Sequence, residues 1–381
     1  MTHYLWQEEN WPLFTWRSEA ILDPLSRCNF KRGQLLGRIA ALGMGLGAEA
    51  RAEVLTVEVL QTSAIEGETL NPEAVRSSVA RRLGVPDAAL AKPDRYTEGL
   101  VDLLLDATTG HDRPLTLERL HGWQAALFPT GFSGLRRVAA GTFRGDSATQ
   151  VISGPIGRER IHYEAPPGSR VENEVLRFLS WWHESRGRID GLLRAAIAGL
   201  WFVTIHPYED GNGRLTRAIT DMALAQDEQL GVRCYALSAQ IMRERDAYYT
   251  ILEKSQQGGL DITEWLLWFL GCFERAIAGS DAVIGTVLDK ARFWEVHGGA
   301  SLTARQRKVV NRLLDAGRGG FAGGLTTRKY SGMTKASRAT SYREISDLLD
   351  KKILIQNPGQ GRSVSYDLAW PDLPPRGSGT A

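Results

Sequence analysis

The chain has 381 residues, of which 43% are apolar, so it is long enough to bury two or three hydrophobic cores. Its 46 basic and 44 acidic residues leave a formal charge of +2. The net charge is too small for the chain as a whole to attract nucleic acid or a membrane surface electrostatically. The longest apolar runs fall far short of the roughly 18 residues that span a bilayer, and no signal peptide is evident. We therefore expect a cytoplasmic protein without membrane contact.

Helical periodicity dominates the first 280 residues, because apolar residues recur every three to four positions. The helices expected on this basis are Arg32–Leu42, Ala48–Ile65, Tyr96–Thr108, Thr116–Leu127, Val171–Glu184, Gly191–Ile205, Leu215–Leu230, Ile241–Gln256 and Asp261–Gly279. One stretch, Gly141–Tyr163, instead contains short strand-like pieces separated by Gly, Asp, Ser and Pro, which predicts a projecting β-hairpin. The expected fold class is mainly α, a helical bundle with one hairpin.

Composition changes divide the chain into five parts. We expect an N-terminal helical region over residues 1–90 and the main bundle over 91–280. Apolar spacing weakens near residue 290, which predicts a linker over 281–300. A small basic domain should follow over 301–370, and a tail over 371–381, rich in Pro, Gly and Ser, should be disordered.

The small domain has a local basic charge, with 13 Lys plus Arg against 4 Asp plus Glu in residues 301–365. Its pattern of three helices followed by two strands is typical of a winged helix-turn-helix. The candidate DNA contacts are Lys335 and Arg338 on the third helix and Arg362 in the wing. Many domains of this kind contact proteins instead, so both interpretations stay open.

The most informative segment is His206-Pro-Tyr-Glu-Asp-Gly-Asn-Gly-Arg-Leu-Thr-Arg217. The proline ends the apolar helix before it, and Gly211 and Gly213 should allow tight turns with positive φ. The next helix should begin at about Gly213, with its unpaired amides facing the same loop. Such amides bind anionic oxygen, and two arginines three residues apart can each bind a phosphate. Each feature alone is more often structural, yet their joint spacing predicts a phosphate-handling site.

This segment resembles the signature of Fic domains, His-Pro-Phe-x-(Asp/Glu)-Gly-Asn-Gly-Arg-x-x-Arg, with Tyr208 in place of the usual phenylalanine. The resemblance implies transfer of AMP from ATP to a Ser, Thr or Tyr hydroxyl of a target protein or of the protein itself. His206 would be the general base, and Asp210 would hold Mg²⁺ on the α- and β-phosphates. The nucleotide would be bound by Gly211, Asn212, Gly213, Arg214 and Arg217, with Arg214 on the β-phosphate and Arg217 on the γ-phosphate.

The resemblance extends to flanking segments. The hairpin lies where Fic proteins carry a flap that pairs with the target backbone, and its candidate contacts are Arg144 and Val151. Tyr248, Tyr249 and Trp265 are candidates for the adenine pocket, although aromatic residues at helical spacing are often core residues. The segment Tyr4–Leu42 is similar to a domain of unknown function that often precedes Fic domains.

Upstream, Thr62-Ser-Ala-Ile-Glu66-Gly67 ends a predicted helix, with the glycine placed as a C-terminal stop. It resembles the inhibitory (Ser/Thr)-x-x-x-Glu-(Gly/Asn) motif of the family. That resemblance implies that Glu66, with Thr62, occupies Arg217 and keeps the γ-phosphate from its site.

Other functions stay open beside an autoinhibited protein adenylyltransferase. The same scaffold could remove AMP or transfer another nucleotide or phosphate-containing group. A third alternative is a regulator that binds DNA through its C-terminal domain and uses the Fic core to sense ATP. The family resemblance also allows a homodimer.

Overall fold

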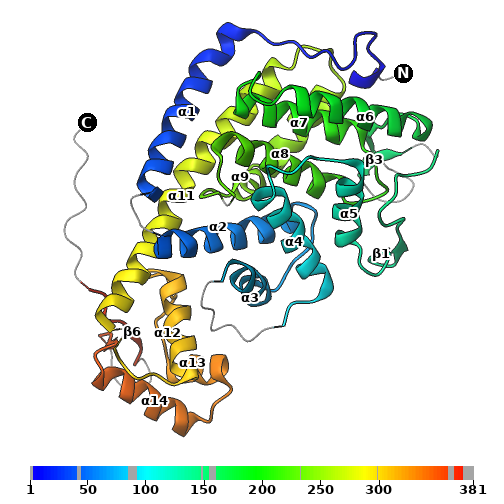
Figure 1. Cartoon of the computed structure of the whole chain (residues 1–381). Helices are drawn as coiled ribbons and strands as arrows, with labels where there is room; N and C mark the ends of the chain where they lie inside the picture. Colours follow the sequence, from blue (N-terminus) through cyan, green and yellow to red (C-terminus); the bar gives the residue numbers. More distant parts are fainter. Residues whose placement is uncertain are drawn as a thin grey trace. The chain divides into compact units, whose positions relative to one another are not determined.

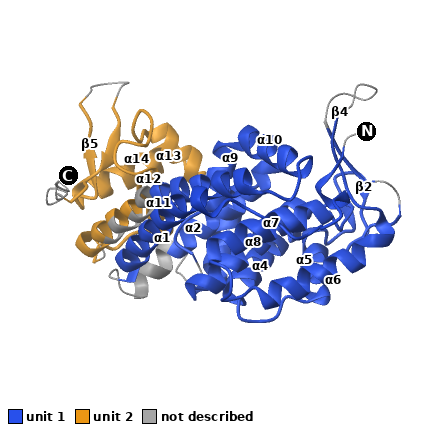
Figure 2. Cartoon of the chain, turned by 90° about the horizontal axis from the view of Figure 1, so that it is seen from above, with its two compact units in different colours: residues 1–43, 51–85, 90–280 blue, residues 44–50, 86–89, 281–381 orange. Residues whose placement is uncertain are grey.

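The structure is a computed structural model that describes residues 3–40, 44–84, 92–146, 149–153, 160–231, 233–297, 299–358 and 364–371. The chain divides into two compact units (Figure 2). One consists of residues 1–43, 51–85 and 90–280, and the other consists mainly of residues 281–381.

The first unit is a helical bundle, as expected, with two small β-hairpins where one was predicted. Its helices, in chain order, are η1 Leu5–Gln7, α1 Ser18–Ala40, α2 Met44–Ile65, α3 Pro72–Leu83, α4 Arg95–Thr109, α5 Leu117–Leu127, α6 Gly168–Glu184, α7 Gly191–Ile205, α8 Asn212–Glu228, α9 Leu237–Arg243, α10 Arg245–Gln256 and α11 Thr263–His297. Its strands are β1 Phe132–Ser133, β2 Arg136–Arg137, β3 Gln150–Ser153 and β4 Arg160–Glu164.

The core of this unit lies around α7, which is buried along its whole length. A helix that is buried on all sides needs neighbours on every face. It packs along α8, which in turn packs against α4 and α5 (Figure 1). The functional motif is the short connection between α7 and α8, so two buried helices fix both of its ends.

The N-terminal region shares this core and does not form a separate compact unit. The indole of Trp11 donates a hydrogen bond to Glu174 on α6 over 2.9 Å, and Thr15 forms a β-bridge with Asp261. The boundary expected near residue 90 is therefore not a boundary between compact units, because the residues on both sides of it pack into the same unit.

Several elements differ from their prediction. The helix expected over Arg32–Leu42 begins earlier, at Ser18. Its first turns were not predicted because they contain Pro24, a residue that usually interrupts a helix. The short helix α3 was missed although Asn71 caps its start, Pro72 occupies its first turn and Gly84 closes it in the left-handed conformation. The expected linker over 281–300 is also wrong, since α11 continues as helix to His297.

The β-hairpin expected within Gly141–Tyr163 is present as antiparallel β3 and β4, with a register shift between Val151 and Ile152. The piece Thr142–Arg144 is not a strand. The smaller β1–β2 hairpin was not predicted.

The second unit has helices and a hairpin in the order α12 Ala304–Ala316, α13 Thr327–Thr334, α14 Arg338–Asp350, β5 Leu354–Gln356 and β6 Tyr366–Leu368. Its core combines residues from all of these elements, among them Val310, Tyr330, Ile345 and Leu368. In the described parts of both units, the helices are too short or too polar to cross a membrane.

Candidate active site

The loop between α7 and α8 begins with an unusual backbone turn at His206. The apolar helix ends there because Pro207 cannot continue it, and His206 takes the left-handed conformation with φ 51° and ψ 58°. Arg144 stabilises this turn from the flap side, since its Nε donates to the carbonyl of His206 over 2.7 Å and its backbone amide donates to Pro207 over 3.0 Å. The imidazole is thereby held at the mouth of a core helix.

Arg144 is therefore a positioning residue, and the prediction that it contacts a target protein is wrong. Its side chain is only 5% exposed, and its other hydrogen bond goes to the carbonyl of Pro166. Val151, the second predicted flap contact, lies on β3 and is 36% exposed. A partner could reach Val151, so that prediction stands untested.

Two side chains inside the loop close it. Asn212 accepts a hydrogen bond from the amide of Tyr208 over 3.0 Å and donates one to its carbonyl over 2.7 Å. The Tyr208 ring is fully buried, and its hydroxyl lies 3.1 Å from Nδ1 of His121. The Tyr208 hydroxyl, which the phenylalanine of the family signature lacks, therefore has the hydrogen-bond partner that a buried phenol requires. The Asn212 side chain uses its hydrogen bonds to close the loop, and its contact with a phosphate stays a prediction.

The two glycines of the loop serve different purposes. Gly211 has φ of 90° and caps the N-terminus of α8, which is the left-handed geometry we expected. Gly213 is helical instead, so the positive φ expected there is wrong. Its lack of a side chain matters because a Cβ at this position would collide with Oε1 of Glu66. Gly213 thus admits the Glu66 carboxylate to the first turn of α8.

Asp210 lies beside the amides of this first turn. Its Oδ1 accepts from the Gly211 amide over 2.6 Å and lies 3.4 Å from a guanidinium nitrogen of Arg214. About a third of its side chain is exposed, so an oxygen can reach a ligand. A single carboxylate suits Mg²⁺, which keeps several waters and takes further oxygens from phosphate.

The environment of His206 keeps its imidazole uncharged. Burial lowers its pKa to about 4, and the nearby Arg144 charge lowers it further in the same direction. The imidazole is therefore neutral throughout the physiological range and free to accept a proton.

Arg217 is held almost entirely by the end of α2. Its Nε donates to the Thr62 hydroxyl over 2.6 Å, and its Nη2 donates to the Thr62 carbonyl over 2.9 Å. The same Nη2 forms an ion pair of 2.7 Å with Oε1 of Glu66. The guanidinium is only 5% exposed, so these contacts occupy the anion-binding group that the sequence assigned to a phosphate.

Arg214 is occupied in a parallel way, which the sequence did not lead us to expect. Its Nη1 donates to the Tyr96 hydroxyl over 2.6 Å and lies 3.2 Å from a carboxylate oxygen of Glu68. Tyr96 in turn donates to the same Glu68 carboxylate. Glu66 and Glu68 both follow α2 closely, with the left-handed Gly67 between them. One short turn thus supplies carboxylates to both arginines of the motif.

The C-terminal half of α2 is anchored independently of these two ion pairs. The buried Glu58 accepts from the amide of Ser238 over 3.0 Å, and Arg245 donates to the carbonyl of Ile65 over 2.9 Å. Because these contacts lie outside the motif, removing Glu66 should leave the helix in place.

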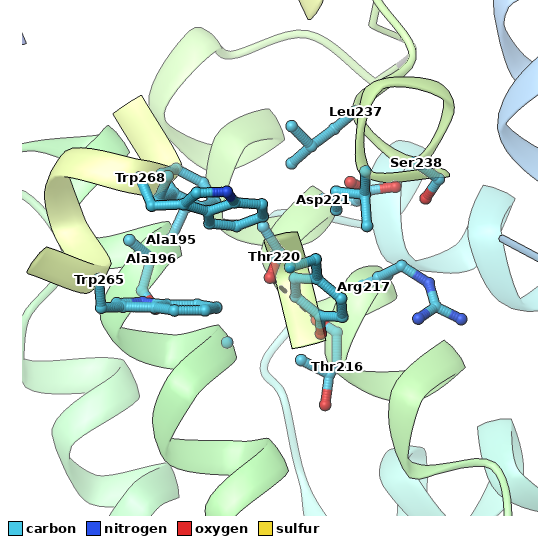
Figure 3. A pocket seen from close by; sticks show the side chains of 14 residues that line it. Ala195, Ala196, Thr216, Arg217, Thr220, Asp221, Leu237, Ser238, Trp265 and Trp268 are labelled. Atoms are coloured by element: carbon cyan, nitrogen blue, oxygen red, sulfur yellow. Dashed lines mark hydrogen bonds between the residues drawn. The ribbon is translucent and has the colours of Figure 1, made fainter. Parts of the chain in front are cut away.

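Next to Arg217 lies a small cavity with walls from α7, α8, α9, α10 and α11, lined in part by Tyr248 and Trp265. Trp265 and Trp268 lie on one side and Asp221 and Ser238 on the other (Figure 3). Its volume of about 20 Å³ suits one water molecule and is far too small for a purine. The predicted adenine contact of Tyr248 is therefore not available in this conformation. Tyr249 is 37% exposed and could still meet a base.

Known proteins resemble two parts of this chain. Residues 114–224 match the Fic/DOC family, and residues 4–85 match a domain of unknown function, DUF4172. The chain therefore contains a Fic/DOC domain preceded by DUF4172. A stretch of 102 residues is 28% identical to a probable protein adenylyltransferase of Aquifex aeolicus (strain VF5) and covers 27% of this chain. It spans only 29% of that protein's length.

Solved structures share the fold. A Fic family protein from Desulfovibrio desulfuricans G20 superposes with a TM-score of 0.52 at 16% identity, covering 93% of this chain and 97% of that one. A fragment of Fic-1 from C. elegans gives 0.50 at 22% identity, covering 71% of this chain and 74% of that one. The mainly helical architecture is thus that of Fic proteins.

The lowered pKa of His206 gives a first prediction. In the folded protein its imidazole should stay neutral from pH 8 down to about pH 5, because burial opposes the charged form. NMR titration of histidine-labelled protein, with the resonance assigned by its loss in His206→Ala, measures this directly. A midpoint near the ordinary value of about 6.5 would contradict the described environment.

Proposed function

We propose that this protein is an adenylyltransferase that moves AMP from ATP to a hydroxyl group of a target protein, and that Glu66 holds it inactive. The observation that carries the proposal is the 2.7 Å ion pair between Glu66 and Arg217 at the end of the His206–Arg217 loop. The Fic/DOC match and the relative named as a probable protein adenylyltransferase support the chemistry.

The proposed reaction needs one base and a set of anion-binding groups. A target hydroxyl oxygen attacks the α-phosphorus, forming a new O–P bond, while the bond to the bridging oxygen breaks and pyrophosphate leaves. Neutral His206 accepts the hydroxyl proton. The free amides at the start of α8 and the two arginines stabilise the phosphate charges. Most of the catalysis would then be positioning and charge stabilisation.

Mg²⁺ would bind at Asp210, with phosphate and water completing its ligands. When bound, it would neutralise charge on the departing pyrophosphate. The side chain of Asp210 fits this task because it is partly exposed and lies beside the amide of Gly211.

The inhibitory step follows from competition for Arg217. A carboxylate and a γ-phosphate cannot share one buried guanidinium, since like charges would then face each other. ATP would either bind weakly or bind with its γ-phosphate displaced. Its α-phosphorus would then be misaligned with the incoming hydroxyl, and a small misplacement is enough to slow transfer strongly.

The target would dock on the β3–β4 hairpin by adding an extended segment to a strand edge. Val151, Ile152 and Ile161 on this hairpin are exposed, and they offer apolar contacts to such a segment. Removal of AMP, or transfer of another nucleotide or phosphate-containing group, stays the alternative on the same residues. The product of the reaction with ATP decides between them.

Glu66→Gly should raise self-labelling with AMP by about 10- to 100-fold over the wild type. A charge-assisted hydrogen bond contributes about 1.5–3 kcal/mol, and its loss frees Arg217 for the γ-phosphate. Mass spectrometry after incubation with ATP and Mg²⁺ reports the nucleotide and the modified residue together. The double variant Glu66→Gly with His206→Ala should show no labelling. Equal labelling of wild type and Glu66→Gly would rule out the inhibitory role.

Glu68→Gln should tighten ATP binding by no more than about fivefold, since Glu68 is 41% exposed and such a pair contributes about 0.2–1 kcal/mol. The matched control is Glu73→Gln, a nearby carboxylate at the start of α3. The readout is the Kd for ATP by calorimetry in both variants. Weaker ATP binding in Glu68→Gln would mean that Glu68 supports Arg214 and does not compete with phosphate.

A further inference from the structure

The second unit has a basic surface that the proposed transfer reaction does not use. Residues 301–365 hold 13 Lys plus Arg and only four acidic residues, and three of these four are paired within the unit. Ion pairs join Asp315 to Lys290, Glu344 to Arg305 and Asp347 to Lys351. The fourth, Asp350, lies at the last turn of α14. The beginning of α14 is therefore free of exposed carboxylates.

Helix α14 separates its buried and exposed residues cleanly. Its buried side holds Ser341, Glu344, Ile345 and Leu348. At 3.6 residues per turn, the exposed residues of its first two turns fall within an arc of about 140° on the opposite side. These are Arg338, Ala339, Tyr342 and Arg343. Tyr342 is 62% exposed, which is unusual for an aromatic ring on a packed helix and points to a contact surface.

The same surface continues onto α13 and the turn before α14. The turn contains Lys335 in the left-handed conformation with φ 56°, and Ser331 fixes it by a hydrogen bond of 2.6 Å to the carbonyl of Ala336. Arg328 in the first turn of α13 and Lys335 are both exposed. Within the described residues, Arg328, Lys335, Arg338 and Arg343 form no ion pair. Four cations thus face solvent from one helix–turn–helix segment.

We propose that this surface, the α13–α14 face, binds double-stranded DNA with the first turns of α14 in the major groove. The face consists of Arg328, Lys335, Arg338, Tyr342 and Arg343. In helix-turn-helix proteins the N-terminal residues of the second helix reach base edges while the first helix lies across the backbone. That placement puts Arg338 and Tyr342 at the bases and leaves Arg328 and Lys335 for phosphates.

The elements after α14 agree with a winged form of this motif. β5 and β6 form an antiparallel hairpin, and Leu325 before α13 bridges to Tyr366 on β6. Arg362, the wing contact expected from the sequence, lies outside the described residues and is not part of the proposed face. DNA binding goes beyond the proposed transferase function and does not depend on it.

The test uses the full chain and a fluorescently labelled random-sequence duplex of about 30 base pairs, followed by anisotropy. On a random-sequence duplex all four cations of the face can contact phosphates, and affinity should then fall about 100-fold between 50 and 200 mM salt. The double variant Arg338→Ala with Arg343→Ala should lose at least tenfold in affinity at 50 mM salt. The matched control, Lys308→Ala with Arg312→Ala, removes the same charge from α12 and should bind like the wild type.

Three outcomes would overturn the proposal. One is no retention of the duplex at 50 mM salt, which would assign the face to a protein partner. Another is an equal loss of affinity in both double variants, because the contact would then be diffuse attraction. The third is equal affinity for an RNA duplex, whose deep and narrow major groove does not admit a helix. Circular dichroism of each variant verifies that the substitutions leave the fold intact.

Discussion

The most constrained group of the candidate active site is the Arg217 guanidinium, which is buried near the start of α8 and needs partners for its charge and its N–H donors. Arg217 is 4% exposed, and leaving its charge unpaired would be strongly destabilising. The described structure supplies Thr62 and Glu66 from the end of α2. Under the proposed function, a triphosphate would offer a stronger anion for the same place. The site would then have two states, which differ in the anion that Arg217 binds.

Under the proposed function, the groups assigned to catalysis need no rearrangement between these states. His206 is already held by Arg144, and the loop is already closed by Asn212 across Tyr208. Gly213 explains why the carboxylate can come so close, since any side chain there would collide with Glu66. Regulation on this account acts on the position of the ligand, while the base and the loop stay preorganised.

The sequence predicted the parts of this site that are local or shared by the family. The helix end at His206 follows from an apolar run before proline, and the meeting of Glu66 with Arg217 follows from the resemblance to Fic proteins. Arg144 was misassigned because an arginine in a hairpin looks like a surface residue, and only the packed structure shows it bonded to the carbonyl of His206. Glu68 and Tyr96 belong to no recognisable sequence motif, so their contact with Arg214 could be seen only in the tertiary structure. By contrast, α3 could have been found from its capping residues alone.

The most direct test of the central claim is a crystal structure of Glu66→Gly with Mg²⁺ and a non-hydrolysable ATP analogue. The account predicts that the γ-phosphate lies within hydrogen-bonding distance of the Arg217 guanidinium, where the Glu66 carboxylate lies in the wild type, with the α-phosphate near His206. A triphosphate bound elsewhere, with Arg217 still bonded only to Thr62, would contradict the claim that Glu66 and phosphate compete for one cation.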